Sequence, residues 1–295
     1  MAVRRRKQRR GRSYAWRYRG RIVACVFVEV LIICALVIMV GWNKGVKEWF
    51  EQFEQPVLKE VDISGINSPN AILMHARGGK VLGEINGDEK IYPASMTKIM
   101  TVILGIENFD DLDEKITLTD EMFAGLYEQD ATQAGFQPGE EVRVIDLLYG
   151  AMLPSGAECC IALADTISGS EADFAELMNK KAAKLGMDNT HFCDSTGLHN
   201  PDHYSTVKDI AVLMKYCIKN DTFREIIETA RHSTGVTNIH PDGITYYSTM
   251  FKNLSDPTVT GGKILGGKTG YTSEAGHCLV SFAEIEGREY IFVSA

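Results

Sequence analysis

Apolar residues recur at helical spacing through the middle of the chain and run in short alternating stretches nearer its C-terminal end. The helical spacing predicts helices over residues 95–107, 144–152, 157–167, 171–185, 206–218 and 222–229. Ser170 and Ser205 precede two of these helices and are expected as N-caps, because a serine hydroxyl accepts a hydrogen bond from the free amides of the first turn. Gly186 is expected to end the helix over 171–185.

Strand patterns lie on both sides of these helices. AILMHA and GKVLGEING predict two strands near residues 71–76 and 79–87, and HCLVSFAEIEGREYIFVSA predicts two more about a turn at Glu286–Gly287. Turns are expected at Gly78–Gly79 and at Asn86–Gly87, and the latter is a strong hairpin signal. We therefore expect an α/β (α+β) domain in which one antiparallel sheet is made from both ends of the domain, flanked by helices, with a helical lobe inserted.

The beginning of the chain has a different pattern. Residues 1–21 hold nine Arg and one Lys without an acidic residue, whereas the rest of the chain holds 21 basic and 39 acidic residues. IVACVFVEVLIICALVIMVGW, residues 22–42, is then apolar over about the length that crosses a bilayer as a helix. This run is long for a signal peptide and no Ala-x-Ala site follows it, so we predict an uncleaved transmembrane signal anchor.

The charge around the apolar run predicts its orientation. Basic residues before it and few after it favour a cytoplasmic N-terminus and an extracytoplasmic remainder. Residues 1–21 would be a cytoplasmic basic arm against anionic lipid. A nucleic-acid-binding arm is disfavoured because it abuts the span. Residues 43–66 are expected as a stalk and residues 67–295 as the folded domain, which places the protein in the cell membrane with a single pass.

Five of the seven cysteines lie outside the apolar run. An odd number excludes a complete disulfide framework, and the spacings do not predict a zinc cluster. Cys159 and Cys160 stand in an apolar helical pattern and are expected to pack as small hydrophobic residues.

The stretch YPASMTKIMT, residues 92–101, places Ser95 and Lys98 three positions apart at the start of a predicted helix. Residues at this spacing share a helix face. A serine becomes a strong nucleophile when a base takes its proton, and a lysine serves as that base when burial or a neighbouring cation lowers its pKa. The helix N-terminus adds free amides suited to an oxyanion. Taken alone, Ser-x-x-Lys fits an N-cap serine beside a solvated lysine better.

Two further stretches change this interpretation. LPSGAE, residues 153–158, is a Pro-Ser-Gly turn between two predicted helices and would present the Ser155 hydroxyl to a cleft. LGGKTGYTSEAG, residues 265–276, carries Lys268-Thr269-Gly270 ahead of the penultimate strand, and its glycines would let another segment approach the strand closely.

In this order and spacing, the three motifs resemble those of the penicillin-recognising serine enzymes. More closely, the chain is similar to the D-alanyl-D-alanine carboxypeptidases among the low-molecular-mass penicillin-binding proteins. The resemblance runs from GKVLGEINGDEKIYPASMTKIMT through HFCDSTGLHNPDHYSTVKDIAVL to GGKTGYTSEAG and covers most of residues 70–295. It implies a β-lactamase/transpeptidase-like fold and a D,D-carboxypeptidase catalytic domain over residues 67–295.

The resemblance implies that Ser95 attacks the carbonyl between the two terminal D-alanines of a peptidoglycan stem peptide and that Lys98 takes its proton. Ser155 would relay a proton towards the departing D-alanine, and water would hydrolyse the acyl-enzyme. No metal or organic cofactor is implied. β-Lactam antibiotics would be covalent inhibitors.

The third motif would bind the substrate. By the same resemblance, Lys268 and Thr269 hold its C-terminal carboxylate, with Gly270 beside them in the motif. The backbone amides of Ser95 and Tyr271 would form the oxyanion hole. The positive charge of Lys268 would also help to keep the catalytic lysine neutral.

Ala157 departs from the family pattern, because the second motif usually carries Asn there. That Asn contacts the lysine and the substrate amide, so its absence removes a polar contact worth roughly 1 to 3 kcal/mol if it is buried beside charge. Glu158 is a candidate substitute. Family members also continue with a helix packed on the sheet, which is expected beyond Ala295.

Other classes of protein fit the sequence less well than this one. A class A β-lactamase would carry Ser-Asp-Asn in its second motif and a deacylating glutamate in a loop, whereas Glu171 and Glu176 fall on a predicted helix. His191, His199 and His203 suggest a zinc D,D-peptidase, but the chain has no His-Glu-x-x-His and these histidines are expected to bind loops instead. Ala157 is the reason to keep a third alternative, a penicillin-recognising cell-wall scaffold without turnover.

Overall fold

The computed structural model describes residues 58–254 and 256–295. Contacts group Lys59–Ala295 into one compact unit. The predicted basic arm and membrane span lie outside the described residues, as does the predicted stalk up to residue 57. Within the described part, no helix is both long and apolar enough to cross a bilayer.

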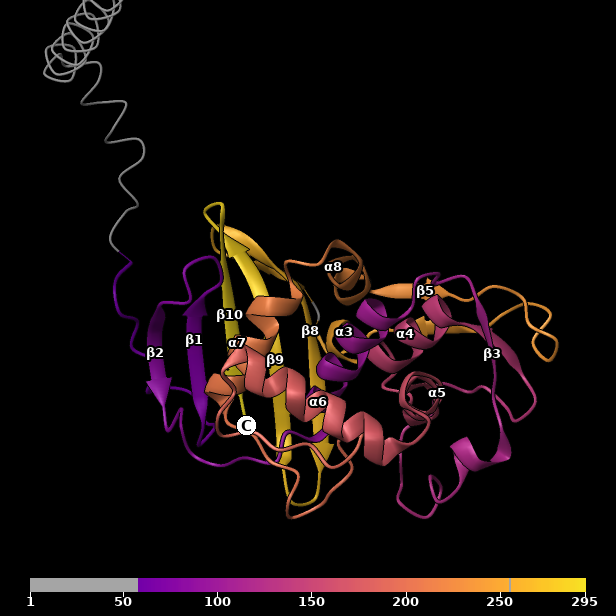
Figure 1. Ribbon diagram of the computed structural model, residues 1–295. Helices are drawn as coiled ribbons and strands as arrows, with labels where there is room; N and C mark the ends of the chain where they lie inside the picture. The colour runs from indigo at the N-terminus through magenta and orange to yellow at the C-terminus, as the bar shows by residue number, and fades with distance from the viewer. Residues whose placement is uncertain (1–57, 255) are drawn as a thin grey trace, which may run out of the picture. The chain divides into compact units, whose positions relative to one another are not determined.

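This unit contains both strands and helices, and its longest helices follow one another in the middle of the chain (Figure 1). The strands are β1 (Ala71–His75), β2 (Val81–Ile85), β3 (Lys115–Thr117), β4 (Glu141–Arg143), β5 (Arg231–Ser233), β6 (Thr245–Tyr247), β7 (Thr258–Val259), β8 (Gly262–Thr272), β9 (Gly276–Ile285) and β10 (Arg288–Ser294). The helices are η1 (Ala94–Thr97), α3 (Lys98–Asn108), η2 (Asp120–Phe123), α4 (Val144–Met152), α5 (Ala157–Ser168), α6 (Glu171–Leu185), α7 (Val207–Cys217), α8 (Asp221–Glu228) and α9 (Thr249–Lys252).

One antiparallel sheet joins the two ends of the domain, in the order β2-β1-β10-β9-β8-β7. β1 pairs with β10 so that Ala71 lies opposite Ser294, although more than two hundred residues separate them. Helix α7 packs on β1, β9 and β10, while the other helices form a lobe beside β8 (Figure 1). The predicted architecture is therefore confirmed.

The helix α3 lies at the centre of the helical lobe and contacts α4, α5 and α7. Its first eight residues, Lys98–Gly105, are all buried. Burial on every side explains why its apolar run, KIMTVILG, shows no exposed polar face. A lysine at the start of such a helix is held in an apolar environment.

The predicted helix ends are mostly confirmed. Ser170 caps α6, since its hydroxyl accepts a hydrogen bond from the Asp173 amide at 3.1 Å, and Gly186 ends α6 with φ 76°. The prediction for Ser205 is wrong. Thr206 caps α7 instead, accepting from the Asp209 amide at 3.0 Å. Beta-branched Thr206 takes the extended conformation that an N-cap requires.

The hairpin signal at Asn86–Gly87 is also wrong. The hairpin of β1 and β2 turns at Gly78–Gly79, which confirms the other predicted turn. The segment between Asn86 and η1 forms a single bridge, from Ile91 to Ser205, and pairs with no strand of the sheet. The Asn86 side chain explains the turn differently, because its amide donates to the carbonyl oxygen of Pro69 at 2.9 Å.

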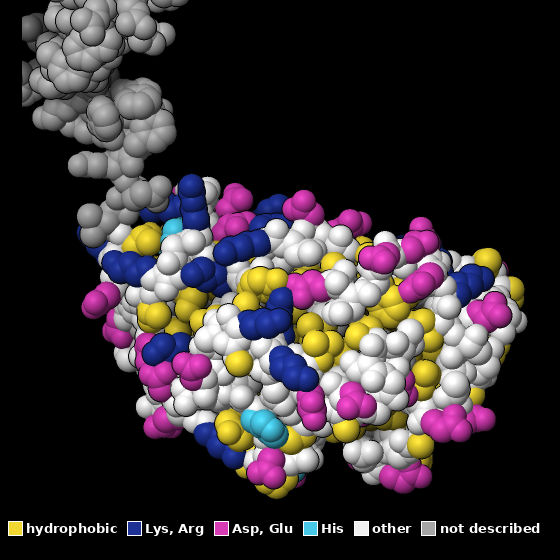
Figure 2. Space-filling view, in the orientation of Figure 1, with side chains coloured by type: hydrophobic (Ala, Val, Ile, Leu, Met, Phe, Trp, Pro, Cys, Tyr) yellow, Lys and Arg dark blue, Asp and Glu magenta, His cyan; other side chains and the backbone are white. Residues whose placement is uncertain are grey.

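Acidic and basic side chains are interspersed over the face of the molecule in Figure 2, so this face carries no large patch of one sign. This differs from the first 21 residues, in which every charged side chain is basic. The charge of the basic arm is therefore not continued on this face of the domain.

Candidate active site

The turn that carries Ser95 begins with a strained residue. Ala94 has φ 46°, a left-handed conformation that residues with a side chain rarely adopt. Ala94 is the first residue of the 3₁₀ turn η1, and α3 starts directly after this turn, at Lys98. Ser95 is partly exposed, whereas Lys98 is 3% exposed. The lysine therefore points into the domain, which excludes the solvated lysine of the simpler interpretation.

The Lys98 amine contacts the serine that the sequence pairs with it. Its Nζ lies 3.0 Å from Ser95 Oγ and 2.7 Å from the carbonyl oxygen of Thr196. Burial lowers the pKa of the Lys98 amine, and the charges of Asp194 and Glu158 oppose this only in part. A buried amine with a lowered pKa is suited to accept the serine proton.

A second serine and lysine meet in the same way. Ser155 lies in the turn between α4 and α5 with φ 74° and is 6% exposed. The Lys268 amine donates to Ser155 Oγ at 2.9 Å and to the carbonyl oxygen of Thr269 at 2.8 Å. Burial, and then the positive charge of Lys98, lower the pKa of Lys268 well below that of a free lysine.

The third motif lies within β8, directly before the penultimate strand β9 as predicted, and it passes close to η1. A Cβ added at Gly270 would lie 3.0 Å from the Ser95 amide nitrogen and 3.1 Å from the Ala94 Cβ. Glycine at this position therefore allows the close approach that the sequence predicts. The side chain of Tyr271 is 61% exposed and its ring centroid lies 4.8 Å from that of His277.

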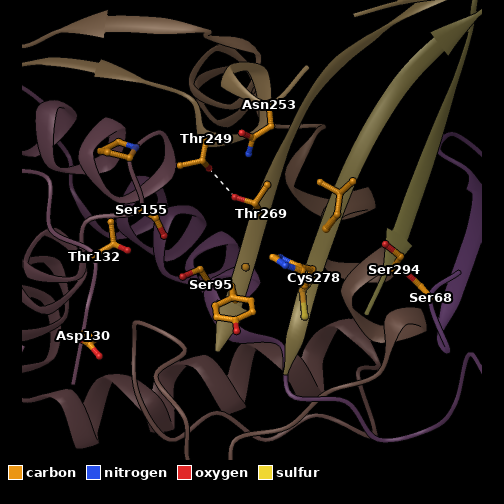
Figure 3. A pocket seen from close by; sticks show the side chains of 15 residues that line it. Ser68, Ser95, Asp130, Thr132, Ser155, Thr249, Asn253, Thr269, Cys278 and Ser294 are labelled. Carbon is orange, nitrogen blue, oxygen red and sulfur yellow. Dashed lines mark hydrogen bonds between the residues drawn. The ribbon is translucent and has the colours of Figure 1, made fainter. Parts of the chain in front are cut away.

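All three motifs line one cleft of about 590 Å³ (Figure 3). Ser95, Ser155, Thr269, Gly270 and Tyr271 contribute to its wall, while both lysines lie behind the serines. The cleft is further lined by Ser68, Asp130, Thr132, Pro154, Thr249, Asn253, His277, Cys278, Leu279 and Ser294. The structure thus brings every predicted site residue to one place.

Thr249 belongs to the cleft although the sequence did not indicate it. Its hydroxyl lies 2.7 Å from that of Thr269, and the two point toward each other in Figure 3. The Thr249 amide donates to the carbonyl oxygen of Leu153, which ties α9 to the turn of Ser155. Two hydroxyls on the wall of the cleft that Ser155 also lines are suited to bind a carboxylate.

Glu158 does not replace the missing asparagine. Its Oε1 accepts from the amides of Ala134 and Gly135 at 2.6 and 3.0 Å, and its Oε2 has no hydrogen-bond partner within the described residues. Burial raises the pKa of the Glu158 carboxyl. The acceptor beside Lys98 is the carbonyl oxygen of Thr196, which sequence motifs based on side chains do not reveal.

The histidines form hydrogen bonds within the protein, and the cysteines form no disulfide among the described residues. His191 Nδ1 lies 2.7 Å from the carbonyl oxygen of Asp202, and His203 Nε2 lies 2.9 Å from Thr97 Oγ1. Over residues 58–254 and 256–295 no group of three or more His, Cys, Asp or Glu side chains could hold a metal ion. The cysteines of this part are free thiols.

Two serine–lysine contacts in a cleft between a sheet and a helical lobe are the arrangement expected of a serine enzyme of the β-lactamase/transpeptidase-like fold. The chain belongs to the D-alanyl-D-alanine carboxypeptidase family (Peptidase_S11), whose model matches residues 57–294.

Curated relatives carry the same name. The chain is 36% identical over 217 residues to D-alanyl-D-alanine carboxypeptidase DacF of Bacillus subtilis, which covers 73% of this chain and 54% of that protein. It is 35% identical over 212 residues to D-alanyl-D-alanine carboxypeptidase of Streptomyces sp. strain K15, covering 69% and 72%. The chain spans about half the length of relatives such as DacF.

A solved structure shares the fold. The crystal structure of the Streptomyces K15 DD-transpeptidase superposes with a TM-score of 0.70 at 29% identity, covering 81% of this chain and 91% of that chain.

Proposed function

We propose that the protein is a serine-type D-alanyl-D-alanine carboxypeptidase that removes the terminal D-alanine from peptidoglycan stem peptides. The observation that carries this proposal is the buried Lys98 amine, 3.0 Å from Ser95 Oγ at the wall of the cleft. Membership of the carboxypeptidase family supports the choice of substrate.

In the acylation step, the neutral Lys98 amine takes the proton of the Ser95 hydroxyl as Oγ bonds to the carbonyl carbon of the penultimate D-alanine. The carbonyl electron pair moves onto its oxygen. The backbone amides of Ser95 and Tyr271 stabilise this oxyanion, a contribution of about 3 to 4 kcal/mol where such donors have been removed from other enzymes. The close approach of β8 to η1 supports this assignment.

The tetrahedral intermediate then loses the terminal D-alanine. Its C–N bond breaks, and the leaving nitrogen takes the hydroxyl proton of Ser155, which in turn receives a proton from the Lys268 ammonium. The proton that Lys98 took from Ser95 then passes to Lys268, so that both lysines return to their starting states. Ser155 lies 2.9 Å from the Lys268 amine, which makes it suited to this relay. Thr269 and Thr249 donate to the carboxylate of the departing residue.

Substrate binding would also prepare the base. A carboxylate beside Lys268 favours the charged form of that lysine. The positive charge of Lys268 then disfavours a second charge on Lys98, since the two amines repel each other. The terminal carboxylate of the substrate would therefore promote the neutral, proton-accepting state of Lys98.

Water hydrolyses the ester of Ser95 and releases the shortened peptide. An amine in place of water would give transpeptidation, the activity named for the structural relative from Streptomyces K15. An open cleft of about 590 Å³ has room for such an acceptor, so transpeptidation is the second candidate. β-Lactam antibiotics would acylate the same serine.

We place this activity outside the cell membrane. The apolar run over 22–42 serves as a single-pass signal anchor, and the basic residues before it stay in the cytoplasm. The support is the pattern of the sequence, together with the extracytoplasmic location of peptidoglycan. Protease added to intact spheroplasts should then digest the domain and leave an epitope placed within residues 1–21 intact. Loss of that epitope as well would contradict this topology.

The test is release of D-alanine from diacetyl-Lys-D-Ala-D-Ala by the full-length protein in detergent. Ser95→Ala is compared with Ser168→Ala, a control at the end of α5 outside the cleft. Release by the parent and the control alone is expected. If the folded parent forms a penicillin adduct but releases no D-alanine, the scaffold alternative replaces this proposal. Added glycine would reveal transpeptidation through a glycyl product.

A further inference from the structure

The Lys98 amine is held in one direction by a carbonyl group. Its Nζ lies 2.7 Å from the carbonyl oxygen of Thr196, and a carbonyl oxygen only accepts hydrogen bonds. One N–H of the amine must therefore point to Thr196. On a neutral amine this contact leaves the lone pair able to face Ser95 Oγ, at 3.0 Å. A displaced Thr196 carbonyl would turn the lone pair away from the serine.

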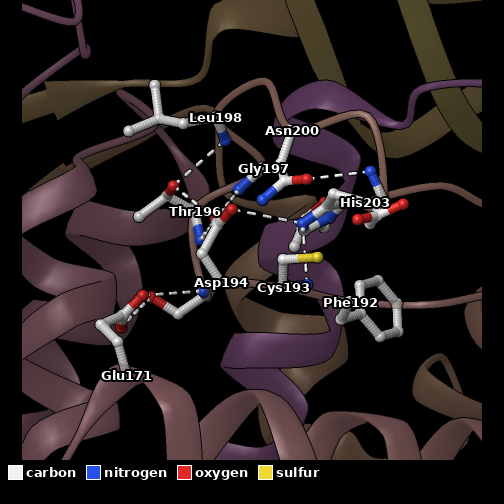
Figure 4. A network of polar contacts seen from close by, with 12 residues as sticks. Glu171, Phe192, Cys193, Asp194, Thr196, Gly197, Leu198, Asn200 and His203 are labelled. Atoms are coloured by element: carbon white, nitrogen blue, oxygen red, sulfur yellow. Dashed lines mark hydrogen bonds and ion pairs between the residues drawn. The ribbon is translucent and has the colours of Figure 1, made fainter.

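Asp194 fixes the turn that presents this carbonyl (Figure 4). Its Oδ1 accepts hydrogen bonds from the Thr196 amide, the Thr196 hydroxyl and the Gly197 amide, each at 2.7 Å. Gly197 has φ 82°, and a Cβ there would collide with the carbonyl oxygen of Ala94. The turn of Asp194 is thus packed directly on the residue before the nucleophile.

His203 connects this turn to η1. Its Nδ1 lies 3.2 Å from Asp194 Oδ2, and its Nε2 lies 2.9 Å from Thr97 Oγ1. The His203 ring is 2% exposed, so these contacts are shielded from solvent. Because Thr97 directly precedes Lys98, these contacts form a closed path from the amine through the turn and back to the base of its own helix.

The charge of Asp194 keeps this arrangement in place. Burial would raise the pKa of Asp194, but the hydrogen bond and charge of His203, with the hydrogen bonds from Thr196 and Gly197, lower it to about 2. The carboxylate is therefore ionised, and hydrogen bonds to an ionised acceptor are short and strong.

We propose that Asp194 and His203 are a positioning pair for the catalytic base: they hold the Thr196 carbonyl where it directs the Lys98 amine at Ser95. This inference rests on the proposed function. Neither residue lies in the three motifs.

A second anchor keeps the loop folded when this pair is removed. Glu171 accepts from the Ser195 amide at 3.0 Å and from the Ser195 hydroxyl at 2.6 Å, from the side of α6. These contacts hold the loop but do not reach the Thr196 carbonyl. Loss of the positioning pair should therefore lower the rate of acylation more than it lowers stability.

The test compares Asp194→Asn, His203→Gln and the double variant with Asn200→Ala in the full-length protein. Asn200 accepts from the Asp202 amide in the same loop but lies off the path to Lys98, so it is the matched control. We measure kcat and KM for D-alanine release, the rate of acylation by benzylpenicillin, and the melting temperature. Each single variant should lower kcat and the acylation rate about 100-fold with KM little changed, because small misplacements of reacting groups have such effects.

The double variant separates a pair from two independent contributions. If Asp194 and His203 act together, it should be no slower than the slower single variant. Additive losses, or folded single variants with the parent's kcat and acylation rate, would overturn the inference. If Asp194→Asn does not fold, His203→Gln and Thr97→Val remove only the outer contacts and decide the question.

Failure of the proposed function would give a different result. A parent that is acylated by benzylpenicillin but releases no D-alanine would contradict the carboxypeptidase, while the acylation rates of the variants would still test the positioning pair.

Discussion

Two serine–lysine pairs face one cleft, and they differ in what surrounds the lysine. In the first pair, Ser95 and Lys98, the two polar atoms are 3.0 Å apart; in the second pair, Ser155 and Lys268, they are 2.9 Å apart. Lys98 also contacts the carbonyl of Thr196, from a remote loop, and has negative groups nearby. Lys268 contacts the carbonyl of the next residue and is repelled by Lys98.

This difference shows how similar contacts acquire different chemistry. Over residues 58–254 and 256–295 no carboxylate forms an ion pair with Lys268, so a substrate carboxylate has most to gain beside it. The first serine is partly exposed at the start of α3, where helix amides favour negative charge, while Ser155 is 6% exposed. We therefore assign the nucleophile and base to the first pair and carboxylate binding and proton relay to the second.

Replacing the serines should give the largest loss of kcat and the clearest difference between the two pairs. Ser95→Ala should lower kcat at least about 10,000-fold, since loss of a nucleophile in other serine hydrolases removes most of the rate enhancement. Ser155→Ala should lose less, because it removes only the relay. Steady-state release of D-alanine measures both. Equal losses would mean that the assignment of roles is wrong.

Replacing the lysines should separate base from binding. Lys98→Met should lower kcat about 100- to 10,000-fold, the range for loss of a general base, with KM little changed. Lys268→Met should raise KM as well, because the substrate carboxylate loses its cation. The same steady-state assay reports both constants. A Lys268→Met variant with an unchanged KM would contradict the binding role.

Thr249→Val should weaken substrate binding by a smaller amount. The hydroxyl pairs with that of Thr269 and would donate to a charged carboxylate, so KM should rise about 10-fold with a smaller change in kcat. Thr166→Val is the control, because the Thr166 hydroxyl donates to the Ala162 carbonyl within α5 and lies outside the cleft. Similar values of KM in the two variants would exclude Thr249 from the binding site.

The dependence of kcat/KM on pH should show how the two lysines affect each other. Burial lowers the pKa of Lys98 from that of an ordinary lysine, so kcat/KM should rise with pH as this amine loses its proton and should level off at a lower pH than an ordinary lysine would give. Lys98 and Lys268 repel each other when both are charged, so the rise should move to higher pH in Lys268→Met. Rates over pH 5 to 11 measure the shift. A rise that moves to lower pH would contradict mutual repulsion of the amines.

The sequence predicts the parts of this molecule that depend on regular spacing. The bounds of α4 and α6 agree with the structure because their apolar residues follow the helical period over nine and fifteen residues. The sheet from both ends of the domain follows from the strand patterns at those ends. The three-residue strands of the β3–β4 and β5–β6 ribbons were not predicted, since such lengths carry no measurable periodicity.

Contacts between remote segments could not be predicted in this way. Thr249 reaches the cleft through a four-residue helix that has no motif. The Thr196 carbonyl is a backbone group that any residue at this position would supply, so the residue type does not indicate its role. Asp194 and His203 come together because His191 and Tyr204 form a bridge that closes the loop between them. The three motifs were found because each depends on side chains near in sequence.

The location of the covalent adduct after the full-length protein reacts with benzylpenicillin tests most directly whether Ser95 is the nucleophile. Peptide mapping by mass spectrometry distinguishes the two serines, since they lie sixty residues apart. We predict the penicilloyl group on Ser95. An adduct on Ser155, or no adduct in the folded protein, would contradict the assignment of the first pair as nucleophile and base.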